Sequence, residues 1–202
     1  MVILIFGDSV TYGEGDRESG WVQRLRKFLD EKTLADKGDF LVYNLGVDGN
    51  DTEDLLKRFN AEARARQPNT IIFAIGTNDS SYRKNRHNPL VSIQKFEKNL
   101  LKLIQEAKKI SDKIVFIGLA KGNDYKTIPL PRSITGKCYD KENVKIYNNI
   151  IKKTCKEKHI FFINIINKLN DKDFYDGLHP SPKGHQKIFE IVKEYLITNK
   201  II

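Results

Sequence analysis

The sequence predicts an α/β fold in which helices cover both faces of a parallel β-sheet. Short apolar runs alternate with segments of helical periodicity along all 202 residues, the order typical of repeated β-α units. The first run, residues 2–6, is continuously apolar, as expected for a strand buried on both faces. Hydrophobic residues make up 40% of the chain, enough for a substantial core. No linker or repeat divides the sequence, so we expect a single domain over residues 1–202.

The expected elements follow one another in a regular order. Apolar runs predict five strands, at 2–6, 40–43, 70–75, 114–119 and 160–163. Helical spacing of apolar residues occurs over 21–29, 55–63, 93–107, 144–151 and 188–196. Asp51 or Thr52 is a natural N-cap for the second helix, and Pro182 suits the first position of the last helix after Ser181. Two connections, 78–90 and 120–142, are long, and long loops in compact domains are more often functional than idle.

The net charge of +9 raises the question of a nucleic-acid or membrane partner. Lysines are spread through every segment, often beside acidic residues, and the one tight basic cluster is Arg83, Lys84 and Arg86. No ladder of basic and aromatic residues accompanies this cluster, as single-strand binding would require. We therefore expect no nucleic-acid partner. No apolar stretch approaches the length that crosses a bilayer, so no membrane span is expected either.

The apolar opening at 2–6 is too short for the hydrophobic region of a signal peptide and follows no basic segment. A cytoplasmic location is therefore predicted, although a mature form trimmed of a signal would look the same. Cys138 and Cys155 are the only cysteines. They make neither a disulfide framework nor a paired metal motif, so we expect two reduced thiols.

Short polar motifs follow the first three predicted strands, where the ligands of open α/β sheets bind. Gly7-Asp8-Ser9 comes directly after the first strand and presents a hydroxyl group there, although such a tripeptide is also a good turn and helix cap. The block from 44 to 52 contains Gly46 and Gly49, whose backbone N–H groups can face an anion. Gly76-Thr77-Asn78-Asp79 follows the third strand and offers a side-chain amide. Taken alone, the last two are more often simple turns.

The fourth motif, Asp176-Gly177-Leu178-His179, lies between the fifth strand and the last helix. A carboxylate three residues before a histidine in a loop can fold back onto the ring and accept a hydrogen bond from Nδ1–H, which leaves Nε2 free as a base. A surface turn before the helix is the competing interpretation. A metal site built from Asp176, His179 and His185 is less favoured, because the spacing is loose and His185 is expected on the first turns of the last helix.

The four motifs together supply a nucleophile, an oxyanion hole, a base and an orienting carboxylate, which is the set of groups that acyl transfer needs. The set also resembles the four sequence blocks of the SGNH hydrolases, also called GDSL esterases or lipases, from Val2 to beyond Gly184. This resemblance implies a three-layer α/β/α sandwich with a flavodoxin-like parallel five-stranded sheet. The sequence departs from the family pattern at Val10, the position of the leucine in the Gly-Asp-Ser-Leu motif that gives the family its name. The apolar exchange should not affect the chemistry.

The resemblance also implies a role for each site residue. Ser9 matches the nucleophile, His179 the base and Asp176 its orienting acid. Gly49 and Asn78 match oxyanion donors together with the N–H of Ser9, although Gly46 lies in the same block as Gly49. No cofactor or metal is implied. The flavodoxin-like alternative, nucleotide or FMN binding, lacks both a Gly-Lys-Ser/Thr sequence and a hydroxyl-rich loop after the first strand.

We therefore expect a serine esterase that acts on a small-molecule ester. The alternative is a catalytically silent ligand-binding module on the same scaffold. The sequence does not choose among short-chain esters, acetylated sugars, lysophospholipids and thioesters, and it does not indicate the oligomeric state. Arg83, Lys84 and Arg86 follow Asn78 closely, so they are possible residues of a substrate rim that attracts anionic esters. A simple solvated loop is the competing interpretation.

Overall fold

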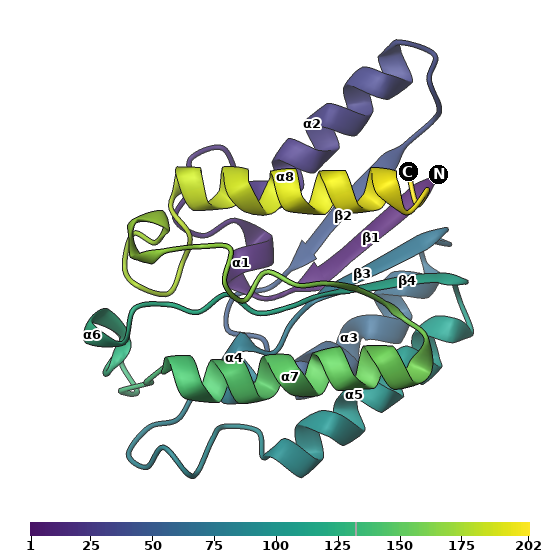
Figure 1. Ribbon diagram of the computed structural model, residues 1–202. Helices are drawn as coiled ribbons and strands as arrows, with labels where there is room; N and C mark the ends of the chain where they lie inside the picture. The colour runs from purple at the N-terminus through teal and green to yellow at the C-terminus, as the bar shows by residue number, and fades with distance from the viewer. Residues whose placement is uncertain (132) are drawn as a thin grey trace.

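The computed structural model describes residues 1–131 and 133–202, and its centre is a parallel β-sheet (Figure 1). Every pair of neighbouring strands is parallel. The order β2-β1-β3-β4-β5 is the flavodoxin-like order, so the predicted fold class is confirmed. The five strands are β1 (Val2–Gly7), β2 (Leu41–Gly46), β3 (Thr70–Ala74), β4 (Lys113–Ile117) and β5 (Phe161–Ile163).

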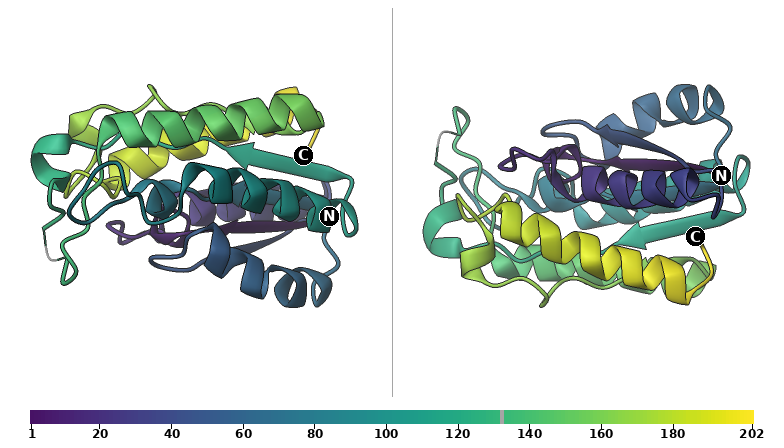
Figure 2. Two further views of the ribbon diagram at one scale, coloured as in Figure 1. Left: turned by 90° about the horizontal axis from the view of Figure 1, so that it is seen from below. Right: turned by 90° about the horizontal axis from the view of Figure 1, so that it is seen from above.

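Five long helices form the two outer layers. α2 (Gly20–Leu34) and α8 (Pro182–Thr198) lie together on one face of the sheet. The other face carries α3 (Thr52–Arg64), α5 (Ile93–Lys108) and α7 (Lys141–Lys158). Figure 2 shows α7, α5 and α3 side by side from below, and α8 beside α2 from above. These layers form because each helix has one apolar face to bury against the sheet.

The alternation of side chains along β1 explains why both faces must be covered. Leu4 and Phe6 belong to the core cluster under α3, α5 and α7, whereas Ile3 and Ile5 belong to the cluster under α2 and α8. Successive side chains of a strand point to opposite faces, and all four are completely buried. The continuous apolar run at the start of the sequence therefore corresponds to a central strand of the sheet.

The helix ends agree with the capping residues expected from the sequence. The Asp51 side chain accepts hydrogen bonds from two N–H groups of the first turn of α3, at 2.8 and 3.0 Å. Ser181 caps α8, and Pro182 is its first residue. Side chains of this kind satisfy N–H groups that have no partner within the helix, so these residues fix where each helix begins.

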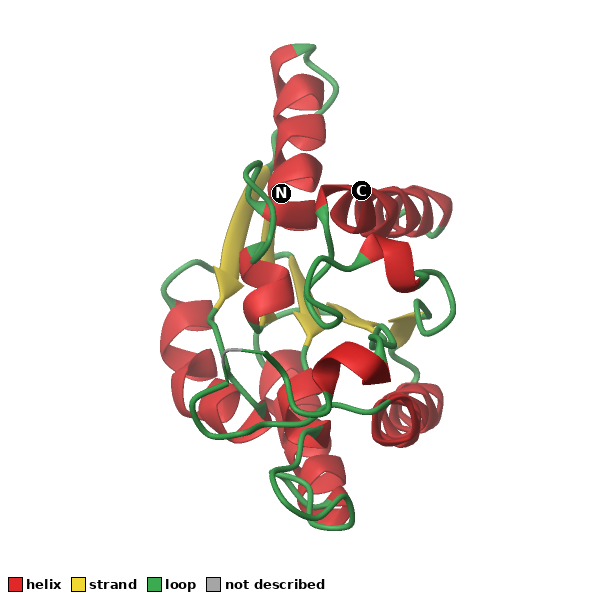
Figure 3. Cartoon of the chain, turned by 90° about the vertical axis from the view of Figure 1, so that its left-hand side faces the viewer, coloured by secondary structure: helices red, strands yellow, loops and turns green. Residues whose placement is uncertain are grey.

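The carboxyl edge of the sheet differs most from the expectation. β2 continues three residues beyond the predicted end at 43, because Asn44, Leu45 and Gly46 pair with Ile5, Phe6 and Gly7 of β1. Four short elements also lie in the loops here: α1 (Ser9–Tyr12), α4 (Thr77–Ser80), α6 (Asp124–Thr127) and the 3-10 helix η1 (Asp171–Asp173). Figure 3 looks onto this edge, with the connecting loops and short helices facing the viewer.

Candidate active site

Ser9 is placed by a sharp turn from β1 into α1. Gly7 makes this turn possible, because a Cβ atom there would lie 2.0 Å from Oγ1 of Thr11 and 2.4 Å from the carbonyl oxygen of Ala74. Asp8 caps α1, and its Oδ1 accepts a hydrogen bond of 3.0 Å from the N–H of Val10. Ser9 is therefore the first residue of α1, at the carboxyl end of a central strand.

His179 is in contact with the Ser9 hydroxyl. Its Nε2 lies 3.0 Å from Oγ of Ser9, and its Nδ1 lies 2.7 Å from Oδ2 of Asp176. The other carboxylate oxygen of Asp176 accepts from the backbone N–H groups of Leu178, at 2.9 Å, and His179, at 2.8 Å. The carboxylate therefore holds both the turn and the ring. With Nδ1–H donated to Asp176, Nε2 is an acceptor that faces the serine hydroxyl.

Charges around His179 favour its protonated form. Burial by itself lowers the pKa of His179, but the hydrogen bond and charge of Asp176, with the charges of Asp8 and Glu14, outweigh burial and raise the pKa above 6.5. Burial raises the pKa of Asp176, and its hydrogen bonds from His179 more than offset this and lower the pKa overall. The pair therefore combines an ionised carboxylate with a histidine of increased basicity.

Three N–H groups of the sequence motifs, those of Ser9, Gly49 and Asn78, are the candidate oxyanion donors. Neither Ser9 nor Gly49 gives its backbone N–H to an acceptor in the described part of the chain. The N–H of Gly46 is already bonded to Oδ1 of Asn44 at 3.0 Å, which favours Gly49 over Gly46 as the donor. Gly49 has a φ of 74°, in the left-handed region that glycine adopts without strain. Nδ2 of Asn78 donates one hydrogen to the carbonyl oxygen of Asn50 at 3.0 Å and retains a second.

Asp79 ties the Asn78 loop to the start of α3. Its carboxylate accepts from the N–H of Thr52 at 3.1 Å and also from the Thr52 hydroxyl, which in turn accepts from Nδ2 of Asn99 at 2.9 Å. Burial raises the pKa of Asp79 to about 7 and that of Asp8 to about 6. Asp8 holds a local turn through the N–H of Val10, whereas Asp79 binds the backbone of a distant loop. Asp79 thereby fixes the loop of Gly49 relative to Asn78.

Two tyrosines at the site were not expected from the sequence. The Tyr139 hydroxyl donates to Oδ1 of Asn78 at 2.8 Å. The ring of Tyr175 stacks on His179 with centroids 5.9 Å apart, and its hydroxyl lies 3.3 Å from Oε1 of Glu14. Tyr139 belongs to the long 120–142 connection, and neither tyrosine belongs to a motif. No local sequence pattern predicts these contacts.

The 120–142 connection reaches two parts of the site. Near its beginning, the N–H of Asn123 donates to the carbonyl oxygen of Gly177 at 2.8 Å, within the loop that carries His179. Near its end, the N–H of Tyr139 donates to the carbonyl oxygen of Thr127, and the Thr127 hydroxyl donates to the carbonyl oxygen of Tyr139. The Tyr139 hydroxyl reaches Asn78. This segment therefore contacts both the loop that carries His179 and the side chain of Asn78.

The basic cluster is separate from this group of residues. Arg83 and Lys84 line an open hollow of about 420 Å³ together with Lys137, and Nε of Arg86 pairs with Asp140 at 3.2 Å. Across 1–131 and 133–202, no hydrogen bond or ion pair connects the three side chains to Ser9 or His179. Their role as a substrate rim stays a prediction.

His185 is a buried residue whose ring contacts the backbone on both sides. It is completely buried on α8, where Nδ1 accepts from the N–H of Trp21 at 3.3 Å and Nε2 lies 3.1 Å from the carbonyl oxygen of Glu14. Both ring nitrogens are thus engaged by backbone groups. Among the residues that the structure describes, no three His, Cys, Asp or Glu side chains gather closely enough to hold a metal ion. Cys138 and Cys155 are both buried and unpaired with each other.

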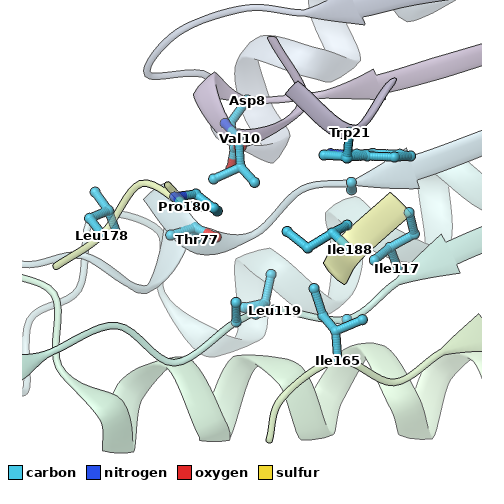
Figure 4. Close-up of a pocket in the computed structure, with 13 residues that line it drawn as sticks. Asp8, Val10, Trp21, Thr77, Ile117, Leu119, Ile165, Leu178, Pro180 and Ile188 are labelled. Carbon is cyan, nitrogen blue, oxygen red and sulfur yellow. The ribbon is translucent and has the colours of Figure 1, made fainter. Parts of the chain in front are cut away.

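A small, mostly apolar cavity lies beside the segments that carry Ser9, Asn78 and His179 (Figure 4). Its volume is about 30 Å³, and its wall includes chain neighbours of three proposed catalytic residues: Val10 after Ser9, Thr77 before Asn78, and Leu178 and Pro180 on either side of His179. Trp21, Ile117, Leu119, Ile165 and Ile188 close it toward the core.

Solved structures share this architecture. A lipase/acylhydrolase from Enterococcus faecalis superposes with a TM-score of 0.77, at 22% identity, over 98% of this chain and 96% of that one. An acetylxylan esterase from Geobacillus stearothermophilus gives a TM-score of 0.75, at 20% identity, over 96% and 93% of the two chains. At these identities the likeness shows the fold.

Sequence relatives include an acetylxylan esterase from Geobacillus stearothermophilus, 25% identical over 209 residues that cover 91% of this chain and 88% of the relative. An uncharacterized lipoprotein, YqeF, from Bacillus subtilis is 31% identical over 111 residues. That match covers 53% of this chain and less than half, 43%, of the lipoprotein. Since a lipoprotein is among the relatives, the cytoplasmic location stays a prediction. No helix within the described residues has the length and apolar character needed to traverse a bilayer.

The GDSL-like Lipase/Acylhydrolase family matches this sequence over residues 3–192. The match covers the five strands, from Ile3 of β1 onward, and all four polar motifs. The chain therefore belongs to the GDSL-like lipase/acylhydrolase family of hydrolases that act on esters.

Proposed function

We propose that this protein hydrolyses carboxylic esters through an acyl-enzyme on Ser9. The observation that carries the proposal is the continuous chain of contacts from Oγ of Ser9 to Nε2 of His179, at 3.0 Å, and from Nδ1 to Asp176, at 2.7 Å. A serine, a base and an orienting carboxylate in this geometry form an activated nucleophile. All three lie where the ligands of open α/β sheets bind.

In the first half of the reaction, Oγ of Ser9 attacks the ester carbonyl carbon while Nε2 of His179 takes the hydroxyl proton. The tetrahedral oxyanion accepts hydrogen bonds from the N–H groups of Ser9 and Gly49 and from the free N–H of Asn78. The imidazolium, stabilised by Asp176, then gives its proton to the leaving alcohol as the C–O bond breaks. Water attacks the acyl-enzyme by the reverse sequence of proton transfers and releases the acid.

The cavity in Figure 4 favours esters with a short acyl group. About 10–15 Å³ of such space holds one water molecule, so a cavity of about 30 Å³ holds a group of only a few heavy atoms, such as acetyl. Apart from Asp8 and Thr77 its wall is apolar, which suits a methyl group rather than an anionic one. The acetylxylan esterase among the relatives supports the same assignment.

The nucleophile is tested by Ser9→Ala, which we expect to lower ester hydrolysis by several orders of magnitude while the protein stays folded. Ser19→Ala is the matched control, because Ser19 is exposed near the same edge and its side chain caps no helix. A fluorophosphonate should label the wild type and the control but not Ser9→Ala. Absence of labelling in the wild type would instead favour a silent binding module. Activity should not respond to EDTA, because side chains perform every proposed step.

Acyl preference is tested with a series of esters from acetyl to hexanoyl. The wild type should have its highest kcat/KM for acetyl, and Leu119→Ala, which enlarges the cavity, should shift the preference toward longer chains. Leu101→Ala is the control, since Leu101 is on the exposed side of α5. Equal rates across the series in the wild type would contradict the assignment of the cavity to the acyl group.

A further inference from the structure

We infer that Tyr139 is a positioning residue for the oxyanion donor Asn78. The inference rests on the proposed function, because it concerns the role of Asn78 in that reaction. Tyr139 lies in the long 120–142 connection, outside every sequence block that the catalytic groups occupy. Its hydroxyl is nonetheless 2.8 Å from Oδ1 of Asn78, and both side chains are buried.

The orientation of the Asn78 amide follows from its two protein partners. The carbonyl oxygen of Asn50 can only accept, so the group facing it at 3.0 Å must be the Nδ2 amine. Oδ1 then faces the Tyr139 hydroxyl, which must donate. Two contacts on opposite ends of the amide restrict its rotation. The second N–H of Nδ2 is left to point in one fixed direction.

Tyr139 can play only the donor role in this contact. Burial, with the charges of Asp8 and Asp176, raises the pKa of the phenol well above its usual range, although a hydrogen bond with Ser81 lowers it in part. The hydroxyl therefore keeps its proton at every pH at which a histidine base operates. A donor on Oδ1 also draws electron density from the amide and makes its N–H groups stronger donors. Tyr139 thus affects both the direction and the strength of the N–H that faces the oxyanion.

The chain offers a matched control in Tyr147. This second buried tyrosine donates its hydroxyl to a backbone carbonyl, that of Val91, and contacts none of the proposed catalytic groups. Tyr139→Phe and Tyr147→Phe remove the same atom from similarly buried positions. A merely structural role for Tyr139 predicts that the two variants behave alike. A positioning role predicts that only Tyr139→Phe changes kcat.

The test is a double-mutant cycle between Tyr139→Phe and Asn78→Ala, measured as kcat and KM on an acetyl ester. We expect Asn78→Ala to lower kcat by about 10²–10³-fold. Tyr139→Phe should lower kcat by about threefold to tenfold, the effect of one hydrogen bond of ordinary strength, and should change KM by less than about twofold. In the Asn78→Ala background, Tyr139→Phe should have no further effect on kcat, because the group it positions is absent.

The outcomes distinguish the oxyanion role of Asn78 from the positioning role of Tyr139. If Asn78→Ala keeps the wild-type kcat, the oxyanion role of Asn78 is wrong and the inference about Tyr139 is wrong with it. If Asn78→Ala loses activity while Tyr139→Phe matches Tyr147→Phe in kcat, the inference alone is overturned. The inference is also overturned if Tyr139→Phe lowers kcat by the same factor with and without Asn78. Thermal unfolding of all variants confirms that each rate belongs to folded protein.

Discussion

Asp176→Asn removes the charge behind His179 while keeping the turn that positions the ring. Oδ1 of Asp176 accepts from the N–H groups of Leu178 and His179, and an asparagine oxygen can do the same. Oδ2, which lies 2.7 Å from Nδ1 of His179, is replaced by an amide NH2 group. The variant therefore changes the electrostatics and the tautomer of the base with little change in its position.

The expected loss has two parts. A hydrogen bond to a charged group contributes about 1.5–3 kcal/mol net, which corresponds to about 10–150-fold in rate at 1.36 kcal/mol per factor of ten. The asparagine amine also donates toward Nδ1, so the ring proton moves to Nε2 and the base faces Ser9 in the wrong tautomer. The two effects together should lower kcat by about 10³–10⁴-fold.

The pH profile gives an independent readout of the same change. His179 must be neutral to act as a base, so kcat/KM of the wild type should rise with pH through the raised pKa of His179, above 6.5. In the variant the charge of Asp176 no longer opposes burial, so the pKa of His179 falls and the rising limb moves to lower pH.

The assay is initial-rate hydrolysis of an acetyl ester followed by titration of the released acid, for pH values from 5 to about 9. Asp171→Asn is the control: Asp171 is exposed and pairs with Lys141 rather than with the base. A variant with the wild-type midpoint and a kcat within tenfold of the wild type would refute the assignment of Asp176 as the orienting acid.

Three further changes test the surroundings of Ser9 and His179. Gly49→Ala places a side chain at a φ of 74°, where it meets no neighbour but strains the backbone. The free energy of unfolding should fall by about 1 kcal/mol, and kcat should fall as the N–H of residue 49 turns away from the oxyanion. An unchanged kcat would assign the donor elsewhere. Glu14→Gln removes one charge that raises the pKa of His179, so the rising limb of the pH profile should move to lower pH, by less than in Asp176→Asn; a fixed limb would exclude this influence. Changing Arg83, Lys84 and Arg86 together to Ser should reduce any preference for anionic over matched neutral esters at low salt, since such charges are screened beyond about 8 Å at physiological salt. Identical preferences in both proteins would make the cluster ordinary surface charge.

The fold and the convergence of the motifs that carry Ser9 and His179 could be predicted because both follow from one property of parallel sheets. All strands end at the same edge, so motifs distant in sequence converge there when each follows a strand. Ser9 and His179 are separated by 170 positions and lie in contact. The resemblance assigned Gly49 rather than Gly46, but the residues alone gave no physical reason for that choice. The reason depends on the Asn44 side chain, which occupies the N–H of Gly46 where β2 extends through these residues.

The contributions of Tyr139 and Tyr175 could not be predicted, for a different reason. Neither tyrosine is part of a motif or a periodic segment, and each contact depends on how its connection folds over the sheet. The short helices α1, α4 and α6 also escaped prediction, because four residues make one turn and carry no hydrophobic repeat. Hydrophobic periodicity predicts which face of an element is buried. It does not predict individual side-chain contacts such as those of Tyr139 and Tyr175.

The 120–142 connection has two anchors, the contact of Asn123 with Gly177 and that of Tyr139 with Asn78, and they limit how this enzyme can be altered. Long loops over an active site are the usual place to exchange segments when a new substrate range is wanted. Here the same segment holds Gly177 through Asn123 and Asn78 through Tyr139. A graft that replaces the whole connection would therefore alter turnover along with selectivity. Exchanges confined to 128–136, between Thr127 and the Tyr139 end, would vary the surface of the loop and leave both anchors in place.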